Sequence, residues 1–216
     1  MKRYDVFFDF DNTITTFDVI DDMLIRFSKD DSWLELERKW KRGLIGSREC
    51  LEGQVKGIRI SKPDLDKYLR TIELDPDFKK LINFLKSKDI KTLILTDNFD
   101  YIVRGILKHK RIQPLGIYSN SLKIRDKHLI PSFPLTNKNH GKRCGHCKKA
   151  TLLKNLDKDS VNVYVGDGLS DVCPSEVADI VFAKGNLKKY LKKKGIAFHP
   201  FRDFKDIYNY FRKELQ

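Results

Sequence analysis

Three short apolar runs, each ending abruptly in polar residues, most constrain how this chain can fold. They lie at residues 4–8, 91–96 and 162–165, and weaker runs occur at 115–119 and 179–182. Runs of this length that are rich in aromatic and β-branched residues predict buried strands.

Segments with helical periodicity lie among these runs. In 77–88 the apolar residues Phe78, Leu81, Ile82 and Leu85 recur on one helical face, and 203–214 repeats the pattern. The segment 119–133 predicts a β-hairpin. Strands that alternate with helices predict an α/β fold, with a Rossmann-like parallel sheet flanked by helices on both faces.

Residues 15–75 contain helical patterns and no convincing strand. Four helices are predicted there, and Ser61 with Asp64 three residues later is typical of a capping box at the start of the fourth. The chain is therefore expected to divide into a core domain of residues 1–14 and 76–216 and a small all-helical cap of residues 15–75.

The composition indicates the expected cellular location of the protein. No run of 18 apolar residues occurs among the 216 residues, so no membrane span is expected. Asp5, Asp9 and Asp11 interrupt the first apolar stretch, which does not resemble a signal peptide. We expect a cytoplasmic protein.

The formal net charge of +13 allows two interpretations. A positive field attracts nucleic acid or small anions. Solvated helix faces explain the same charge, and the lysine-rich stretch 186–195 is typical of such a face. No platform of aromatic and basic residues is evident, so nucleic acid is not the expected partner. A non-catalytic basic nucleic-acid-binding module is the alternative from another functional class.

Four groups of polar residues stand where a predicted strand ends or a predicted helix begins. They are Asp9, Asp11 and Thr13; Thr96, Asp97 and Asn98; Lys148 and Lys149; and the segment Gly-Asp-Gly-Leu-Ser-Asp that contains Asp167 and Asp171. Ligands of open α/β sheets bind just beyond the carboxyl ends of the strands. We therefore expect the four groups to converge on one crevice.

Several carboxylates in one crevice repel one another unless a cation compensates them. Mg²⁺ binds a few carboxylates together with substrate phosphate oxygens, and Lys148 and Thr96 offer donors to the remaining phosphate oxygens. Alternate residues of a strand face the same side about 6.6 Å apart. This spacing allows one aspartate to attack phosphorus while the other reaches the leaving oxygen. Asp9 is the predicted nucleophile, which would form an aspartyl-phosphate. Asp11 is the predicted general acid, which would then activate water as a base.

These motifs resemble those of the haloacid dehalogenase superfamily of phosphatases, which carry Asp-x-Asp-x-Thr/Val, a strand-end Ser or Thr, a Lys and Gly-Asp-Gly-x-x-Asp. The resemblance covers nearly the whole chain, and the helical insert resembles the small cap of the phosphoserine-phosphatase-like branch. It implies that Asp9, Asp167 and the backbone carbonyl of Asp11 bind Mg²⁺, supported by Asp171 and Thr13.

The resemblance also implies a phosphate site and a small-molecule phosphate ester as the partner. The implied phosphate-binding residues are Thr96, Asp97, Asn98 and Lys148, with Lys149 as the alternative to Lys148. Hydrolysis and phosphoryl transfer to another acceptor are both compatible with these motifs, and the oligomeric state is left open.

Two positions in the predicted cap bear on the substrate. Phosphoserine phosphatases carry a Glu soon after the first motif and an Arg in the cap, where this chain has Asp18 and Gln54. Without the Arg, the fork that binds a carboxylate is missing, which disfavours phosphoserine. The segment 166–174 resembles phosphoethanolamine/phosphocholine phosphatases. The segment 144–153 and the C-terminal tail resemble the methionine-salvage phosphatases for hydroxy-keto-methylthiopentenyl phosphate, which we favour.

The segment 140–149 carries a Cys-x-x-Cys pair that allows a zinc site. Cys144 and Cys147, with His140 or His146, are candidate Zn²⁺ ligands. The alternative is a loop whose cysteines only pack, because structural zinc sites usually need four ligands. The two remaining cysteines, at positions 50 and 173, are expected to be packing residues.

Overall fold

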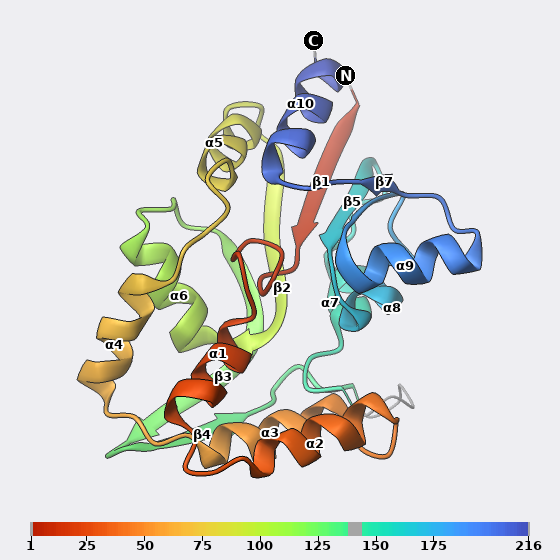
Figure 1. The fold of residues 1–216 in the computed structure, drawn as a ribbon. Helices are drawn as coiled ribbons and strands as arrows, with labels where there is room; N and C mark the ends of the chain where they lie inside the picture. Colours follow the sequence, from red (N-terminus) through yellow and green to blue (C-terminus); the bar gives the residue numbers. More distant parts are fainter. Residues whose placement is uncertain (1, 138–143, 216) are drawn as a thin grey trace.

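One mixed sheet organises the computed structural model, which describes residues 2–137 and 144–215. The order of its seven described strands is β4-β3-β2-β1-β5-β6-β7, and Figure 1 shows β1 at its centre. The strands are β1 (Arg3–Phe8), β2 (Lys91–Phe99), β3 (Gly116–Arg125), β4 (His128–Ser132), β5 (Ser160–Gly166), β6 (Ile180–Ala183) and β7 (His199–Pro200). All neighbours are parallel except β3 and β4, so the predicted parallel α/β sheet and the predicted hairpin are confirmed.

The register of the central strands brings their carboxyl ends level. Phe8 is paired with Ile94 of β2 and with Val165 of β5. The next residue, Asp9, still donates its backbone N–H to the Val165 carbonyl at 2.9 Å. The polar residues that follow β1 and β5 therefore leave the sheet side by side.

Side chains that alternate along β1 bind helices to opposite faces of the sheet. Tyr4, Val6 and Phe8 belong to one large apolar cluster, whereas Phe7 packs with Leu152 on the other face. The first cluster receives α5 (Phe78–Ser87), α6 (Asp100–His109) and α10 (Phe204–Glu214). The other face carries α7 (Lys148–Asn155), with α8 (Val172–Ser175) and α9 (Gly185–Lys194) beside it.

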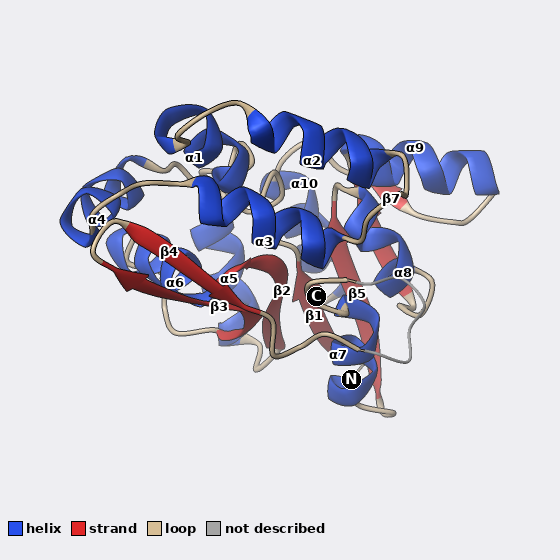
Figure 2. Ribbon diagram, turned by 90° about the horizontal axis from the view of Figure 1, so that it is seen from below, coloured by secondary structure: helices blue, strands red, loops and turns tan. Residues whose placement is uncertain are grey.

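The insert after β1 is helical, as predicted. It contains α1 (Val19–Phe27), α2 (Ser32–Lys41), α3 (Ser47–Gly57) and α4 (Lys62–Thr71). The Ser61 side chain accepts the Asp64 N–H and so caps α4. Figure 2 shows α2 and α3 side by side across the end of the sheet.

The β3–β4 hairpin of the sheet contacts this helical insert. Arg59 and His128 form an isolated antiparallel bridge, and the Ile60 N–H donates to the Lys127 carbonyl at 3.0 Å. Helix α3 also packs on β4. The insert is thus held at its base beside β1, at the hairpin tip and where α4 packs on α6.

Two helices, α6 and the short α8, lie where the sequence pattern above predicts none. Helix α6 buries Ile102, Val103, Ile106 and Leu107, but Gly105 interrupts this run and weakens its helical signal. The longest helices, α3 and α10, have 11 residues. In the described part of the chain, no helix is long and apolar enough to cross a membrane.

Phe204 tests how far the aromatic cluster stabilises the fold. Its ring lies 5.0 Å from that of Phe78 and 5.8 Å from that of Phe8, centroid to centroid, and it is fully buried. We expect Phe204→Ala to lower the free energy of unfolding by about 3–5 kcal/mol, because it removes a large buried ring and leaves a cavity. Urea denaturation measures the change.

The control is Ile25→Ala, since Ile25 is 71% exposed on α1. That substitution should alter the free energy of unfolding by less than about 0.5 kcal/mol. Equal effects of the two substitutions would contradict the assigned core.

Candidate active site

A buried lysine connects residues from three separate segments at the carboxyl end of the sheet. Lys148, the first residue of α7, places its Nζ 2.5 Å from Asp9 Oδ1 and 2.8 Å from Asp171 Oδ1. The Lys148 side chain is 2% exposed, and those of Asp9 and Asp171 are 7% and 0% exposed. The structure thus brings together residues that lie up to 162 positions apart, as the strand-end argument predicts.

The charges of this group explain the ionisation of the lysine. Burial lowers the pKa of Lys148, but the charges of Asp171 and Asp9 outweigh that effect and raise it well above its ordinary value. Burial also raises the pKa of Asp9. One ammonium group therefore faces more negative charge than it can neutralise.

Three carboxylates form a compact cluster beside Lys148. One oxygen from each of Asp9, Asp167 and Asp171 lies within 4.8 Å of the others. Asp167 also accepts the Thr13 hydroxyl at 3.2 Å. Burial and the Asp171 charge raise the pKa of Asp167 to about 6. Clustered oxygen ligands with uncompensated negative charge fit a hard divalent cation such as Mg²⁺.

Asp171 differs from the other two carboxylates because protein donors already surround it. Its Oδ2 accepts the backbone N–H groups of Asp167 at 3.0 Å and Gly168 at 2.9 Å. Its Oδ1 accepts the Tyr164 hydroxyl at 2.7 Å in addition to Lys148. Asp171 thus holds the loop after β5 in place, whereas Asp9 and Asp167 have more oxygen lone pairs available for a metal.

Asp11 occupies a separate, well-ordered position. Both of its carboxylate oxygens accept the Asn98 amide at 3.0 Å, and Oδ1 also accepts the Val19 N–H at 3.0 Å. Burial, together with the charge of Asp18, raises its pKa well above the ordinary value. A carboxyl group whose pKa is raised is suited to act as a general acid.

The segment after Leu95 carries the predicted phosphate-binding residues. The pairing of β2 with β3 is irregular there, and the Thr96 hydroxyl accepts the Asn98 N–H at 2.9 Å. Asp97 Oδ1 accepts the His146 N–H at 2.9 Å. The Asn98 side-chain amide donates to Asp11, so we do not expect this amide to bind the phosphate.

The comparisons with known proteins agree with this geometry. The sequence profile of the haloacid dehalogenase-like hydrolases matches residues 6–173, which is more than half of the chain. The chain belongs to the haloacid dehalogenase-like hydrolase family. The similar proteins include a 2-hydroxy-3-keto-5-methylthiopentenyl-1-phosphate phosphatase of Bacillus cereus strain B4264, which is 26% identical over 94% of this chain and 93% of its own length. Another is Pdp3-interacting factor 1 of Schizosaccharomyces pombe, 26% identical over 100% of this chain and 96% of its own.

Solved structures in this family share the fold. A substrate-bound phosphoserine phosphatase superposes with a TM-score of 0.74 at 19% identity, covering 97% of this chain and 99% of the other. A phospho-aspartyl intermediate analogue of phosphoserine phosphatase gives 0.72 at 20% identity with the same coverage. The predicted haloacid dehalogenase-type fold is thereby confirmed.

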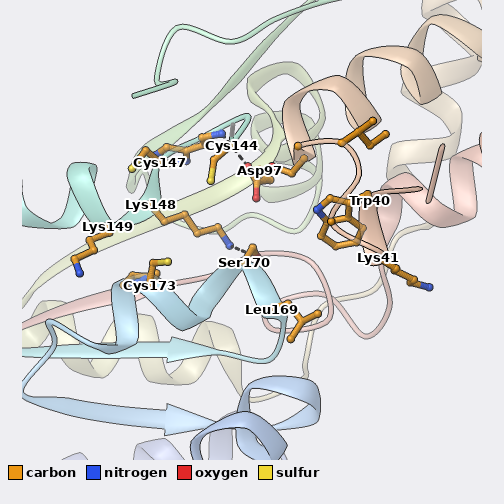
Figure 3. A pocket seen from close by; sticks show the side chains of 16 residues that line it. Trp40, Lys41, Asp97, Cys144, Cys147, Lys148, Lys149, Leu169, Ser170 and Cys173 are labelled. Atoms are coloured by element: carbon orange, nitrogen blue, oxygen red, sulfur yellow. Dashed lines mark hydrogen bonds between the residues drawn. The ribbon is translucent and has the colours of Figure 1, made fainter. Parts of the chain in front are cut away.

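The structure separates the two candidate lysines of this hydrolase. Lys148 points into the carboxylate cluster. It also donates to Ser170 Oγ at 3.2 Å, a contact drawn in Figure 3. Lys149 points away from the cluster and lies 3.4 Å from Glu176 at the surface. The geometry places Lys148, and not Lys149, beside the candidate nucleophile.

Two adjoining cavities reach Lys148 and Asp11 from the side of the helical insert, and Asp9, Asp167 and Asp171 are not among the residues that line them. The larger measures about 380 Å³ and is lined by Lys148, Ser170 and the Trp40 ring (Figure 3). The smaller measures about 150 Å³ and is lined by Asp11 and by both predicted substrate-selecting residues, Asp18 and Gln54.

The Cys-x-x-Cys segment offers little support for a zinc site among the described residues. Its partner His140 lies outside them. Both ring nitrogens of His146 are occupied, at 2.9 Å from the Thr96 carbonyl and 2.7 Å from Thr151 Oγ1. No metal-binding group in the described chain includes Cys144 or Cys147. Both cysteines instead line the larger cavity.

Three residues of the site carry no clear signal in the sequence. Tyr164 reads as an ordinary core residue of β5, yet its hydroxyl orients Asp171. Ser170 lies in the Gly-Asp-Gly-x-x-Asp motif, at one of the two positions where the motif allows any residue. The sequence suggests His146 only as a zinc ligand, yet its ring joins Thr96 to α7. The hydrogen-bond partners of these three side chains become evident only in the tertiary structure.

Gly166 tests the close packing below the cluster. A Cβ at this position would lie 2.6 Å from Asp171 Oδ2, so alanine must displace the carboxylate that holds the loop. We expect Gly166→Ala to lower the free energy of unfolding by about 1–3 kcal/mol, measured by urea denaturation.

The control is Gly57→Ala at the end of α3, where an added Cβ meets nothing within 4 Å. It should be neutral or stabilising by up to about 1 kcal/mol. A Gly166→Ala protein as stable as the wild type would disprove the tight packing against Asp171.

Proposed function

We propose that this protein is an Mg²⁺-dependent phosphomonoester hydrolase that uses Asp9 as its nucleophile. The observation that carries the proposal is the direct contact between the buried Lys148 ammonium group and Asp9, inside a cluster of carboxylates. The family supports it, as do the relatives named phosphatases. We further propose that residues 1–14 and 76–216 form the catalytic core and that residues 15–75 form the cap.

Asp9 is positioned to attack phosphorus. Its backbone N–H is fixed by β5, and Lys148 holds one carboxylate oxygen, so the other oxygen is free to attack. The attack would form an aspartyl-phosphate and release the alcohol. Lys148 would meanwhile bind a phosphate oxygen, with the Thr96 and Ser170 hydroxyl groups as further donors.

Asp11 would move the proton in both halves of the reaction. Its raised pKa allows it to hold a proton and donate it to the leaving oxygen. The resulting carboxylate would then take a proton from the water that hydrolyses the aspartyl-phosphate. Asn98 and the Val19 N–H fix its orientation throughout.

The residues present fit Mg²⁺. Asp9 and Asp167 would hold it together with the Asp11 backbone carbonyl, while Asp171 and Thr13 would orient the Asp167 loop. Bound Mg²⁺ would neutralise charge on the phosphate and on the carboxylates. This arrangement compensates the excess of negative charge around Lys148.

The substrate is a small phosphomonoester. The relatives named for 2-hydroxy-3-keto-5-methylthiopentenyl-1-phosphate make that compound the first to test. Phosphoserine is disfavoured, because no arginine or lysine is among the described residues that line the smaller cavity. A substrate carboxylate would find no cationic partner there.

Replacing the nucleophile tests the proposed mechanism. We expect Asp9→Asn to lower kcat on para-nitrophenyl phosphate with MgCl₂ by at least about 10³-fold, because an amide cannot form the aspartyl-phosphate. Asp5→Asn is the matched control, since Asp5 is buried on the same strand but pairs with Lys91 at 3.4 Å. Wild-type turnover in Asp9→Asn would rule out the mechanism.

The metal site has a test that does not depend on activity. The pKa of Asp167 is raised to about 6, so its contribution to stability without metal is present below its unfolded pKa and is lost as pH rises through 6. Mg²⁺ binds the ionised form and competes with the proton. We therefore expect MgCl₂ to raise Tm more at pH 7.5 than at pH 5.

The matched variant is Asp167→Asn, which should abolish most of the Mg²⁺-dependent rise in Tm at pH 7.5. Differential scanning fluorimetry with EDTA as the metal-free reference gives the shift. An Mg²⁺ effect that is independent of pH and unchanged in Asp167→Asn would contradict the assigned ligand.

A further inference from the structure

Thr96 lies where the regular pairing of the sheet ends. On one side, the pairing of β2 with β1 ends at Ile94, which is opposite Phe8. On the other side, the pairing of β2 with β3 stops at Leu95 and resumes only at Phe99. Thr96 is nevertheless 1% exposed, and a buried carbonyl group needs a hydrogen-bond partner. The sheet by itself therefore does not fix the position of this residue.

The ring of His146, which is 2% exposed, supplies a partner from another segment. Its Nδ1 lies 2.9 Å from the Thr96 carbonyl oxygen, and its Nε2 lies 2.7 Å from Thr151 Oγ1. Thr151 is the fourth residue of α7, the helix that begins at Lys148. The ring therefore connects the end of β2 to the helix that carries the buried lysine.

The two partners assign the tautomer of the ring. A carbonyl oxygen can only accept a hydrogen bond, so Nδ1 carries a proton and donates it to Thr96. Burial lowers the pKa of His146, so the ring is neutral at neutral pH and Nε2 carries no proton. The Thr151 hydroxyl then donates to Nε2. Both ring nitrogens thus have a partner, and the direction of each hydrogen bond is determined.

The backbone of His146 holds the same loop at a second point. Its N–H donates to Asp97 Oδ1 at 2.9 Å. One residue therefore contacts two consecutive residues of the loop, Thr96 and Asp97, which restrains the orientation of the loop as well as its distance from α7. We call these three hydrogen bonds, to Thr96, Asp97 and Thr151, the His146 clamp.

The segment that carries His146 is fixed independently of the ring. The N–H of Gly145 donates to Ser47 Oγ at 3.0 Å, and the N–H of Cys147 donates to the Leu135 carbonyl at 3.0 Å. A change of the His146 side chain leaves both hydrogen bonds in place. The clamp can therefore be altered at the ring while the backbone around it is retained.

The His146 clamp joins the two groups that would bind phosphate. The Thr96 hydroxyl accepts the Asn98 N–H at 2.9 Å, which leaves its own proton for a phosphate oxygen. Lys148 lies two residues after His146, and its ammonium group is held by Asp9. A misplacement of about 1 Å can slow a reaction about 100-fold, so the distance between Thr96 and Lys148 matters for the chemistry.

We propose that His146 is a positioning residue that sets the distance between Thr96 and Lys148 through its Nδ1–H bond to the Thr96 carbonyl. The proposal rests on the hydrolase function above and adds to it a residue that acts through others. His146 itself would not bind the phosphate through its ring, because both ring nitrogens already have protein partners.

Two substitutions separate the two ring nitrogens. The amide nitrogen of asparagine takes nearly the place of Nδ1, so His146→Asn keeps a donor for Thr96 and loses the contact with Thr151. The amide nitrogen of glutamine takes nearly the place of Nε2, so His146→Gln keeps the contact with Thr151 and loses the donor for Thr96. The two variants are therefore matched controls for each other.

Binding of inorganic phosphate measures the effect without turnover. In a ³¹P NMR titration with MgCl₂, we expect His146→Gln to bind phosphate about fivefold or more weakly than the wild type, because Thr96 loses the hydrogen bond that positions it. His146→Asn should remain within about twofold of the wild type. For para-nitrophenyl phosphate, kcat/KM should follow the same order, with most of the change in KM, since the phosphate contact exists before the transition state.

A purely structural role of His146 predicts a different result. Each substitution removes one buried hydrogen bond, so each would destabilise the protein in urea, but the folded molecules would bind phosphate equally well. Phosphate affinity of His146→Gln equal to or above that of His146→Asn, at a temperature where both are folded, overturns the proposal.

The wild type offers a test that does not require any variant to fold. Long-range ¹H–¹⁵N correlation spectra distinguish the two neutral tautomers of an assigned histidine from each other and from the charged ring. We expect His146 to be neutral and protonated at Nδ1 at pH 7.5, with and without MgCl₂ and phosphate. An Nε2–H tautomer or a charged ring overturns the proposal.

The outcomes distinguish this proposal from the hydrolase function. If no phosphomonoester is hydrolysed but His146→Gln alone loses affinity for phosphate, the hydrolase function fails and the His146 clamp stands. If esters are hydrolysed and the two variants have the same phosphate affinity and the same kcat/KM, the clamp is overturned and the hydrolase stands. A wild type that neither binds phosphate nor hydrolyses an ester overturns both.

Discussion

The buried contact between Lys148 and the carboxylates of Asp9 and Asp171 is the interaction on which the rest of the site depends. A buried ammonium group is costly unless it is paired, and here it joins the start of α7 to the loops after β1 and β5. Removing one partner would leave an uncompensated charge in the core. The same contact sets the position of the proposed nucleophile, so stability and chemistry depend on the same atoms.

The helical insert supplies one side of the cleft beside this centre. Helix α2 carries Trp40 and Glu37 over the carboxyl end of the sheet, while the β3–β4 hairpin contacts the insert through Arg59 and His128. The cleft is therefore positive where it meets Lys148 and negative where it meets α1 and α2.

Much of the fold and several site residues are predictable from local pattern. The apolar runs at 4–8, 91–96 and 162–165 became central strands, and residues 15–75 form the four expected helices. The sequence does not predict helix α6, which a glycine interrupts, nor the four-residue helix α8 and the two-residue strand β7, which are too short. Neither has a periodic signal strong enough to be read from the sequence.

The sequence by itself determined the alternation of strands and helices and the polar residues at their ends, because both depend on local periodicity and on spacing along the chain. Only the tertiary structure decided which lysine faces Asp9 and that Tyr164 orients Asp171. It also placed Asp18, Glu37 and Gln54 around one cavity. No local sequence pattern connects the residues in these relations, so the relations exist only once strand register and helix packing have fixed the distances between the side chains.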